Sequence, residues 1–467
     1  MIPESAGAQA TTPVSLRPWQ RLEALLLPGW RRALATISLL GLATVFGAAM
    51  VFATQTLLAR ELGPNDYGRF VSSLATVTMI APLAAFGLTQ FRMKVYGVEG
   101  WAAHRWIKPS LQFTLATTAL AFVILFGWAL LFAPHDGTRF DLFVLSPVIL
   151  CFLAIDLIAN KLRLEDNYRA MALWLSLMIP SSRLMVVLLL LLLAQPSATF
   201  VACCYGAIAL LVAVAGLPHL RVLVRDEIKL RGHGPRSLEA LPDAPSPSVY
   251  ELWSQAWAYG VYAALYPVFF QISTILLKYL DGDAQAGMYS IGLAVMTAIY
   301  LIPTTIYQKF LLAKLHRWAA HDRPKFWLVY RQGNIGMLAL GVLIAIGLAA
   351  ASPWIVPLVF GHAYRGVVSI LLVLSLCPPL RFLSTAMGSV LLTEDYMRYR
   401  VYAISAATLI VIVVNAALIP RFAGVGAAWG TVAGELALLL GTWSSVRLFR
   451  REEPDDGGPA VDEPVTP

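Results

Sequence analysis

Long apolar runs separated by short polar segments fill the chain between its two polar ends. An α-helix needs about 20 apolar residues to cross a bilayer, because it rises about 1.5 Å per residue. A β-barrel would instead show short segments of alternating polarity. The runs predict twelve helical spans: 36–58, 70–91, 110–133, 141–160, 170–194, 199–220, 253–278, 287–308, 334–358, 367–392, 399–419 and 424–446. The sequence therefore predicts an all-α integral membrane protein.

Lysine and arginine gather in every second loop between these predicted spans. They crowd the segment before the first span, the loops after the even-numbered spans, and the tail after the last span. The intervening loops hold few of them. Cytoplasmic loops carry an excess of Lys and Arg, so this alternation supports twelve spans and predicts that both termini are cytoplasmic.

A segment rich in proline and charge, 226–249, divides the spans six and six and is predicted to be a cytoplasmic linker. It separates an N-lobe at 34–225 from a C-lobe at 250–448. Residues 1–33 form a cytoplasmic N-terminal segment with the pattern of an amphipathic stretch on the membrane surface. Residues 449–467 are predicted to be a disordered cytoplasmic tail.

The two lobes carry an internal repeat. The stretch "LLARELGPNDYGRF" at 57–70 aligns without gaps to "LLKYLDGDAQAGMY" at 276–289, an offset of 219 positions. The alignment pairs two glycines of each copy, Gly63 with Gly282 and Gly68 with Gly287. Both copies join the first and second spans of their lobe, and six spans separate them. This implies a parallel repeat about an axis along the membrane normal, with a cleft between two six-helix bundles and alternating access by rocking.

Composition narrows the function classes. Hydrophobic residues make up 58% of the chain, charged residues 13%, and the mean hydropathy is +0.69. The net charge of +8 follows from the loop bias rather than from a nucleic-acid surface, so no nucleic-acid partner is expected. The four cysteines lie inside apolar runs without metal spacing. Hydrolase, Walker and zinc motifs are missing, so neither an enzyme nor a bound cofactor or metal is expected.

Four charged residues lie within the predicted spans, where each costs about 2.5–3.5 kcal/mol on insertion scales. They are Arg183, Arg381, Asp156 and Glu435. One interpretation is that they form structural ion pairs between helices. The other is a cationic patch for an anionic head group, with the carboxylates pairing to it or coupling transport to a proton or sodium gradient. Pro378 and Pro379 precede Arg381 and are expected to bend that helix.

Further polar residues lie where the cleft is expected to open. Arg92 ends the second span and Lys278 lies near the outer end of the seventh, and each is alternatively an interfacial charge. Gln90 and Gln271 are uncharged candidates that either line a wet cavity or join helices. Gln271 follows "YPVFF" on the first helix of the C-lobe, which borders the cleft.

Four segments resemble one known family. "LLARELGPNDYGRF" with "FGLTQFRMK", "DGDAQAGMYSIGLAV", "SPWIVPLVFGHAYRG" and "VVNAALIPRFAGVGAAWGTVAGEL" are similar, in family order, to segments of the polysaccharide export and O-antigen flippase family. The resemblance covers about residues 35–448. That family belongs to the multidrug/oligosaccharidyl-lipid/polysaccharide (MOP) superfamily, whose MATE and MurJ-like members have two six-helix bundles around a central cavity.

The resemblance implies export of polyprenyl-diphosphate-linked oligosaccharides across the bacterial inner membrane. It implies membrane lipids and other polysaccharide assembly proteins as partners. Arg92, Arg183 and Arg381 would hold the diphosphate, since arginine pairs with phosphate bidentately. Where many relatives carry an acidic residue in the seventh helix, this chain has Ser273. That departure leaves Asp156 and Glu435 as the ion-coupling candidates.

Three alternatives to a lipid-linked oligosaccharide flippase stay open at this point. An ion-coupled exporter of small cationic drugs belongs to the same superfamily, but carboxylates should dominate its cavity. A membrane-embedded glycan ligase or polymerase would place its catalytic groups on a long outer loop, and the outer loops here are short. A partner-binding scaffold for glycan assembly is the third.

Overall fold

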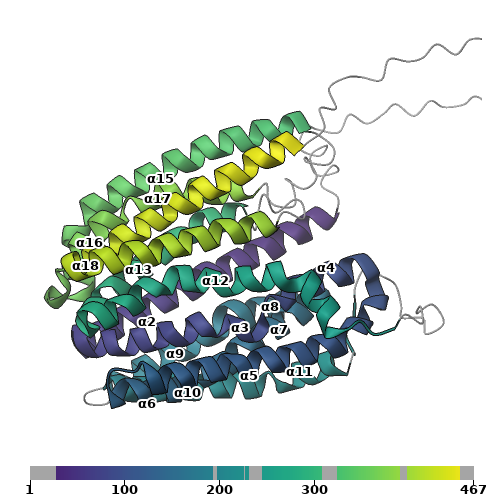
Figure 1. The fold of residues 1–467 in the computed structure, drawn as a ribbon, viewed down its shortest axis with the longest axis horizontal. Helices are drawn as coiled ribbons and strands as arrows, with labels where there is room; N and C mark the ends of the chain where they lie inside the picture. Colours follow the sequence, from purple (N-terminus) through teal and green to yellow (C-terminus); the bar gives the residue numbers. More distant parts are fainter. Residues whose placement is uncertain are drawn as a thin grey trace, which may run out of the picture.

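The computed structural model describes residues 28–192, 197–225, 227–230, 245–307, 323–389 and 397–452. This part of the chain is built of helices and contains no strand. Figure 1 shows the long helices lying side by side along the longest axis of the molecule. Most of the predicted N-terminal segment, linker and tail fall outside the described residues, but residues 28–33 belong to the first long helix.

The N-lobe helices follow the predicted order, with several spans divided by a break. Their bounds are α2 (Pro28–Ile80), α3 (Pro82–Ala85), α4 (Leu88–Glu99), η1 (Gly100–Trp106), α5 (Ile107–Leu131), α6 (Asp136–Leu145), α7 (Pro147–Leu164), α8 (Tyr168–Ala172), η2 (Leu173–Leu177), α9 (Met178–Leu190), α10 (Ala198–Ala215) and α11 (Leu217–Val224). The second predicted span, expected to end at residue 91, continues in α4 as far as Glu99.

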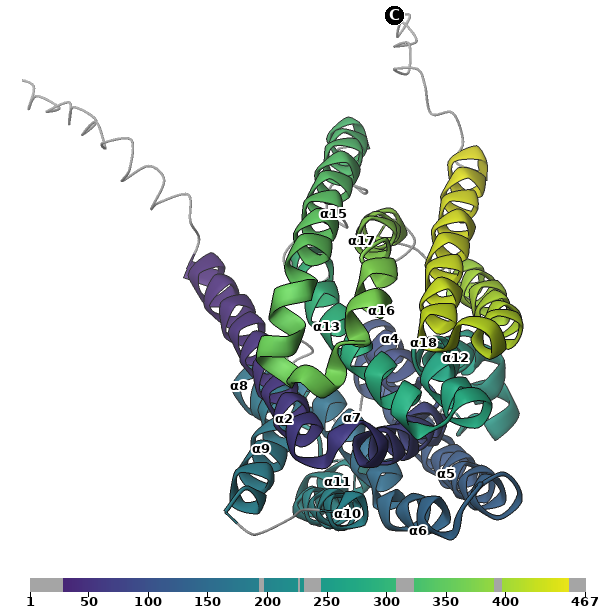
Figure 2. The same ribbon diagram turned by 90° about the vertical axis from the view of Figure 1, so that its left-hand side faces the viewer.

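The C-lobe repeats this plan with longer helices. Its elements are α12 (Val249–Asp281), α13 (Asp283–Thr304), α15 (Arg323–Phe360), η5 (His362–Tyr364), α16 (Val367–Leu374), α17 (Cys377–Gly388) and α18 (Met397–Glu452). The tenth span breaks between α16 and α17, directly before the two prolines that were expected to bend it. Figure 2 shows α13 and α15 to α18 gathered together, with α5 to α11 gathered on the other side of the molecule.

Nine helices of the described part are long and apolar enough to cross a membrane. One of them, Leu39–Leu131, contains three passes, and another, Met397–Leu448, contains two. Long helix α2 is divided at Gly63 and α18 at Ala423, where the backbone leaves the helical conformation. The passes coincide with the predicted spans, and the protein is a multi-pass membrane protein of about twelve helices.

The repeat-related glycines confirm the predicted duplication in their backbone conformation. Gly63 has φ 70° and ψ 174°, and Gly282 has φ 95° and ψ 175°. This region of φ and ψ is open essentially to glycine alone. Each glycine ends the first long helix of its lobe and reverses the chain into the second. The same residue at the same position of both lobes therefore builds the same turn.

The second pair of repeat glycines brings the two lobes into direct backbone contact. A Cβ on Gly68 would lie 1.7 Å from the carbonyl oxygen of Asp283, and one on Gly287 would lie 2.6 Å from that of Pro64. The two turns thus pack against each other at one end of the molecule. We call this the outer end, because the charge bias of the loops predicts it to be non-cytoplasmic.

Hydrogen bonds between the lobes add to this contact at the outer end. The Tyr364 hydroxyl donates to the Ala59 carbonyl at 2.8 Å, and the Trp128 indole donates to the Tyr279 hydroxyl at 2.8 Å. Apolar side chains of both lobes, including Phe70 and Tyr364, belong to one buried cluster. The outer end is therefore closed by contacts between the lobes.

Four charged side chains lie at the same closed outer end. Arg69 of α2 lies 3.1 Å from the carboxylate of Asp141 on α6, and Lys278 of α12 lies 3.4 Å from the carboxylate of Asp283 on α13. Asp141 is fully buried, and it also interacts electrostatically with Lys278. We call these residues the outer charge group. Each of its two ion pairs lies within one lobe, and the pairs face each other across the lobe boundary.

At the opposite, inner end, the lobes meet through a break in the second pass. Phe86 and Gly87 adopt left-handed backbone conformations between α3 and α4. A Cβ on Gly87 would lie 2.5 Å from the backbone of Tyr259, and one on Gly260 would lie 1.9 Å from the Phe86 ring. The Phe86 ring also stacks on Trp253 with 5.3 Å between centroids. The break between α3 and α4 therefore packs closely against α12.

Candidate functional site

Arg183 stands beside a narrow cavity inside the N-lobe. It lies on α9, half-buried, with its guanidinium 4.4 Å from the centre of the Tyr205 ring on α10. The cavity has a volume of about 30 Å³ and is lined by both residues and by Thr54, Tyr67 and other residues of α2. Among the described residues, none forms a hydrogen bond with the buried Arg183 Nε. The cavity therefore offers one unsatisfied donor and space for about one or two water molecules in this closed arrangement.

Local helix geometry sets the position of Arg183. The turn η2 before α9 is a π-helix, a wide turn that often occurs at functional sites. It packs closely on α2, because a Cβ on Gly47 would lie 2.0 Å from the carbonyl oxygen of Ser176. Pro180 follows within α9 and lines the same cavity.

The charge of Arg183 is not balanced within the described part of the chain. No carboxylate there forms an ion pair with it, and its electrostatic neighbours are Tyr205 and Cys151. A cation inside a span is costly unless it finds a counter-charge or water. Arg183 is thus a mid-span cation in a lobe whose neighbouring groups do not neutralise it.

Arg381 in the C-lobe differs from Arg183, because it has a buried carboxylate partner. Its guanidinium lies 3.6 Å from the carboxylate of Glu435 on α18, and it donates to the Tyr266 hydroxyl at 2.6 Å. The rings of Phe270 and Tyr300 lie 4.9 and 5.3 Å from its guanidinium carbon. Glu435 is fully buried. Arg381 and Glu435 therefore form a buried ion pair between α17 and α18, which is compatible with a structural pair and with a carboxylate paired to a cationic patch.

Replacing Glu435 with alanine is expected to destabilise the protein by about 3–5 kcal/mol, because it leaves the Arg381 charge buried without its partner. The measurement is thermal unfolding of the purified protein in detergent. The double variant Glu435→Ala with Arg381→Met should recover most of the loss, since both charges are gone. Equal instability of the single and double variants would show that Glu435 acts through packing rather than through its charge.

Arg92 lies on α4 and is 3% exposed, and its two buried terminal nitrogens have no hydrogen-bond partner in the part of the chain that the structure describes. Its electrostatic partner of opposite sign is Asp156 on α7. The Thr89 hydroxyl donates to Asp156, and the Asn160 amide donates to the Thr89 carbonyl at 3.1 Å. Arg92 and Asp156 therefore form a second cation and carboxylate set, separate from the contacts of Arg183 and Arg381.

The remaining candidates lie in three different settings. Lys278 is buried at the outer end, where it pairs with Asp283. Gln90 is exposed between buried neighbours on α4, and Gln271 is half-buried on α12. Ser273 accepts a hydrogen bond from the Asn415 amide at 2.8 Å. This hydrogen bond links α12 to α18.

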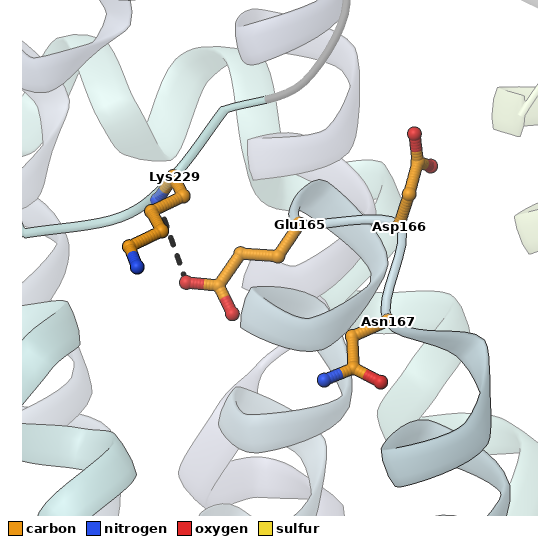
Figure 3. Close-up of a pocket in the computed structure, with 4 residues that line it drawn as sticks. All are labelled: Glu165, Asp166, Asn167 and Lys229. Carbon is orange, nitrogen blue, oxygen red and sulfur yellow. Dashed lines mark hydrogen bonds between the residues drawn. The ribbon is translucent and has the colours of Figure 1, made fainter.

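A wider pocket lies at the inner end of the N-lobe, and Figure 3 shows the residues that line it: Glu165, Asp166, Asn167 and Lys229. Its volume is about 340 Å³. The Lys229 backbone N–H donates to Glu165 at 3.4 Å, and Lys161 lies 2.9 Å from the same carboxylate. Ile228 and Leu230 are buried beside it. The first residues of the predicted linker therefore pack against the N-lobe beside this pocket.

Sequence reasoning missed several residues that complete these clusters. Arg69 and Asp141 are not among the site residues predicted from the sequence. Tyr205, Tyr266 and Tyr300 supply rings to the two intramembrane arginines. The available signal was the run "YGVYAALYPVFF" in α12, which places aromatic residues at four-residue spacing on one helix face.

The fold is that of MOP-superfamily transporters. The structure of lipid II flippase MurJ in an inward closed conformation matches with TM-score 0.67 at 12% identity, covering 88% of this chain and 87% of that chain. An inward-facing multidrug resistance MATE family transporter of the MOP superfamily matches with TM-score 0.63 at 12% identity, covering 88% and 98%. A MOP superfamily transporter from Pyrococcus furiosus matches with TM-score 0.59 at 14% identity, covering 89% and 95%.

The family itself follows from the sequence match. The model of the family described as polysaccharide biosynthesis protein matches residues 33–311, which is more than half of the chain. The protein belongs to this polysaccharide biosynthesis family, and the predicted resemblance is confirmed. No curated protein matches the chain.

Proposed function

We propose that this protein is a flippase that moves a polyprenyl-diphosphate-linked oligosaccharide across the bacterial inner membrane by alternating access of its two lobes. The observation that carries the proposal is Arg183. Its charge lies within a span, beside a cavity, without a carboxylate partner among the described residues. An anionic ligand would supply the missing counter-charge, and a planar guanidinium binds phosphate oxygens bidentately.

The family and the fold support a lipid-linked substrate. The family is one of polysaccharide biosynthesis, and MurJ, which shares the fold, is a lipid II flippase. A substrate of this kind has a diphosphate that arginine can bind, sugars that the cleft expected between the lobes would shield, and a lipid tail that stays in the bilayer. The relatives are described as transporters and flippases, which favours transport over glycan transfer or polymerisation.

The contacts of the C-lobe disfavour the alternative of a cationic drug exporter. Arg381 and Arg400 already lie over the aromatic rings that a cation would use, and Glu435 is fully buried against Arg381. A cationic drug would therefore meet like charge and find no accessible carboxylate there. This arrangement favours a substrate that is anionic or neutral over the one that carries positive charge.

The other candidate residues keep proposed roles around Arg183. Arg92 would join the diphosphate site when its carboxylate partner, Asp156, becomes protonated. Arg381, the other arginine predicted for the diphosphate, is paired with Glu435 and Tyr266 in the C-lobe, and Glu435 stays the second ion-coupling candidate. A proton gradient could drive this exchange, and sodium is the alternative coupling ion. Lys278 would act at the outer end, and Gln90 and Gln271 would contact sugar or phosphate on the path between.

Conditional depletion tests the proposed function, with thin-layer analysis of polyprenyl-linked glycans from the depleted cells. A complete repeat unit is expected to accumulate on the cytoplasmic face of the inner membrane, because the glycan is assembled there and cannot cross. Accumulation of single units on the outer face would instead indicate a polymerase or ligase. Normal glycan together with altered dye efflux would indicate a drug exporter.

A further inference from the structure

Three aromatic side chains form a stripe along α12 in the C-lobe. Tyr262, Tyr266 and Phe270 are spaced four residues apart, so they lie on one face of the helix. Their ring centroids are 5.9 Å apart between the first two and 5.0 Å apart between the last two. We call these three residues the aromatic stripe.

Arginines from two other helices hold the aromatic stripe in place. Arg400 of α18 donates to the Tyr262 hydroxyl at 2.8 Å and lies 4.5 Å from its ring centre. Arg381 of α17 donates to the Tyr266 hydroxyl and also lies over the Phe270 ring. Each tyrosine oxygen is thus fixed by a charged donor, and the ring orientations are set before any ligand arrives.

The stripe stays partly accessible despite these contacts. Tyr266 is 37% exposed, while Tyr262 and Phe270 are half-buried. The contacting groups come from α13, α17 and α18. Figure 2 shows α13 and α18 close to α12. Tyr266 is therefore the most accessible member of the aromatic stripe.

The chemistry of the stripe favours a neutral, hydroxyl-rich, flat ligand. A cation is disfavoured because two guanidinium groups already lie on these rings. An acyl chain would gain nothing from the two tyrosine hydroxyls and the arginine donors beside them. A pyranose ring presents C–H bonds on its flat face and hydroxyls at its rim. The C–H face suits the negative face of an aromatic ring, and the hydroxyls suit arginine and tyrosine donors.

We infer that the aromatic stripe of α12 is a binding surface for the sugar rings of the transported substrate, separate from the anion site at Arg183 in the N-lobe. This inference rests on the proposed function and assigns the two chemical parts of the substrate to different lobes. The N-lobe holds the diphosphate through Arg183. The C-lobe holds the glycan through Tyr266, with Tyr262 and Phe270 above and below it.

The experiment compares binding of two probes by the purified full-length protein in lipid nanodiscs. One probe is polyprenyl diphosphate bearing a short oligosaccharide, and the other is polyprenyl diphosphate without sugar. The wild type is expected to bind the glycosylated probe about tenfold more tightly. Tyr266→Ala should lose that difference and keep its affinity for the bare diphosphate, which also shows that the variant is folded. Tyr266→Phe keeps the ring but loses the hydroxyl that Arg381 fixes, so it should keep only part of the preference.

Two further variants complete the comparison. Tyr402 lies on α18 and is 62% exposed, and Tyr402→Ala should change neither affinity. Arg183→Ala should weaken both probes by a similar factor, because it removes the contact to their common diphosphate. An unchanged preference in Tyr266→Ala, or equal wild-type affinity for the two probes, would overturn the sugar surface and leave the proposed function standing. Failure of the wild type to bind either probe would overturn both.

Discussion

Replacing Arg183 with alanine is expected to abolish glycan export while the protein remains folded and inserted. The side chain is the mid-span cation that no described carboxylate balances, so its loss removes the contact proposed for the diphosphate. The same change should leave the thermal stability unchanged or raise it, because an uncompensated intramembrane charge is removed. The measurements are complementation of a depleted strain and thermal unfolding in detergent.

Two conservative variants sharpen the Arg183 result. Arg183→Lys keeps the charge but loses the planar, bidentate donor set and the stacking on Tyr205, so only partial export is expected. Tyr205→Phe keeps the ring and should keep most export. Wild-type complementation by Arg183→Ala would contradict the assignment of this residue to the substrate. A loss of stability as large as that expected for Glu435→Ala would instead mark Arg183 as a structural cation.

Replacing Gly68 with alanine should separate the lobes at the outer end. The added Cβ would lie 1.7 Å from the Asp283 carbonyl oxygen, and a backbone group cannot turn aside as a flexible side chain does. The expected loss of stability is about 1–3 kcal/mol, the usual range for overpacking. Spin labels at exposed His135 and Ala363 should report a longer distance between the lobes in pulsed electron resonance.

Matched glycines control for helix propensity and side-chain size. Gly287→Ala adds a Cβ on the other side of the same contact, and it should also lower the stability and lengthen the label distance. Gly127→Ala lies on α5, where a Cβ meets nothing within 4 Å, and should leave the label distance unchanged and the stability equal or higher. If the Gly68→Ala protein has the wild-type label distance and stability, the backbone at the outer contact accommodates a Cβ without separating the lobes, and the prediction is wrong.

The fold could be predicted because its determinants are local in the sequence. Apolar runs of span length locate the helices, and the loop charges alternate with them. The glycine pair Gly63 and Gly282 marked the duplication, and both glycines have the same backbone conformation. The breaks were harder to place. Phe86 and Gly87 interrupt the second pass because α12 approaches there, and the contact with Gly260 lies far along the chain.

The candidate site could be predicted only as a set of residue types. Arg183, Arg381, Asp156 and Glu435 stood out because charge is rare inside spans. Their partners depend on how distant helices pack, so Arg381 with Glu435 was one of several open pairings. Tyrosines are common in membrane helices, and nothing local distinguishes Tyr205 or Tyr266 from the rest. Their importance comes from the arginine that tertiary packing places over each ring.

The outer charge group has a consequence for how the protein responds to membrane voltage. Moving one elementary charge through the whole membrane field involves about 2.3 kcal/mol per 100 mV. Arg69 and Asp141 move together with the N-lobe, and Lys278 and Asp283 move together with the C-lobe. Each pair is neutral, so separating the lobes at this end displaces almost no net charge. We therefore expect that opening of the outer end does not depend on membrane potential through these four residues, and that any voltage dependence of transport arises elsewhere, as at the unbalanced charge of Arg183, the substrate or the coupling ion.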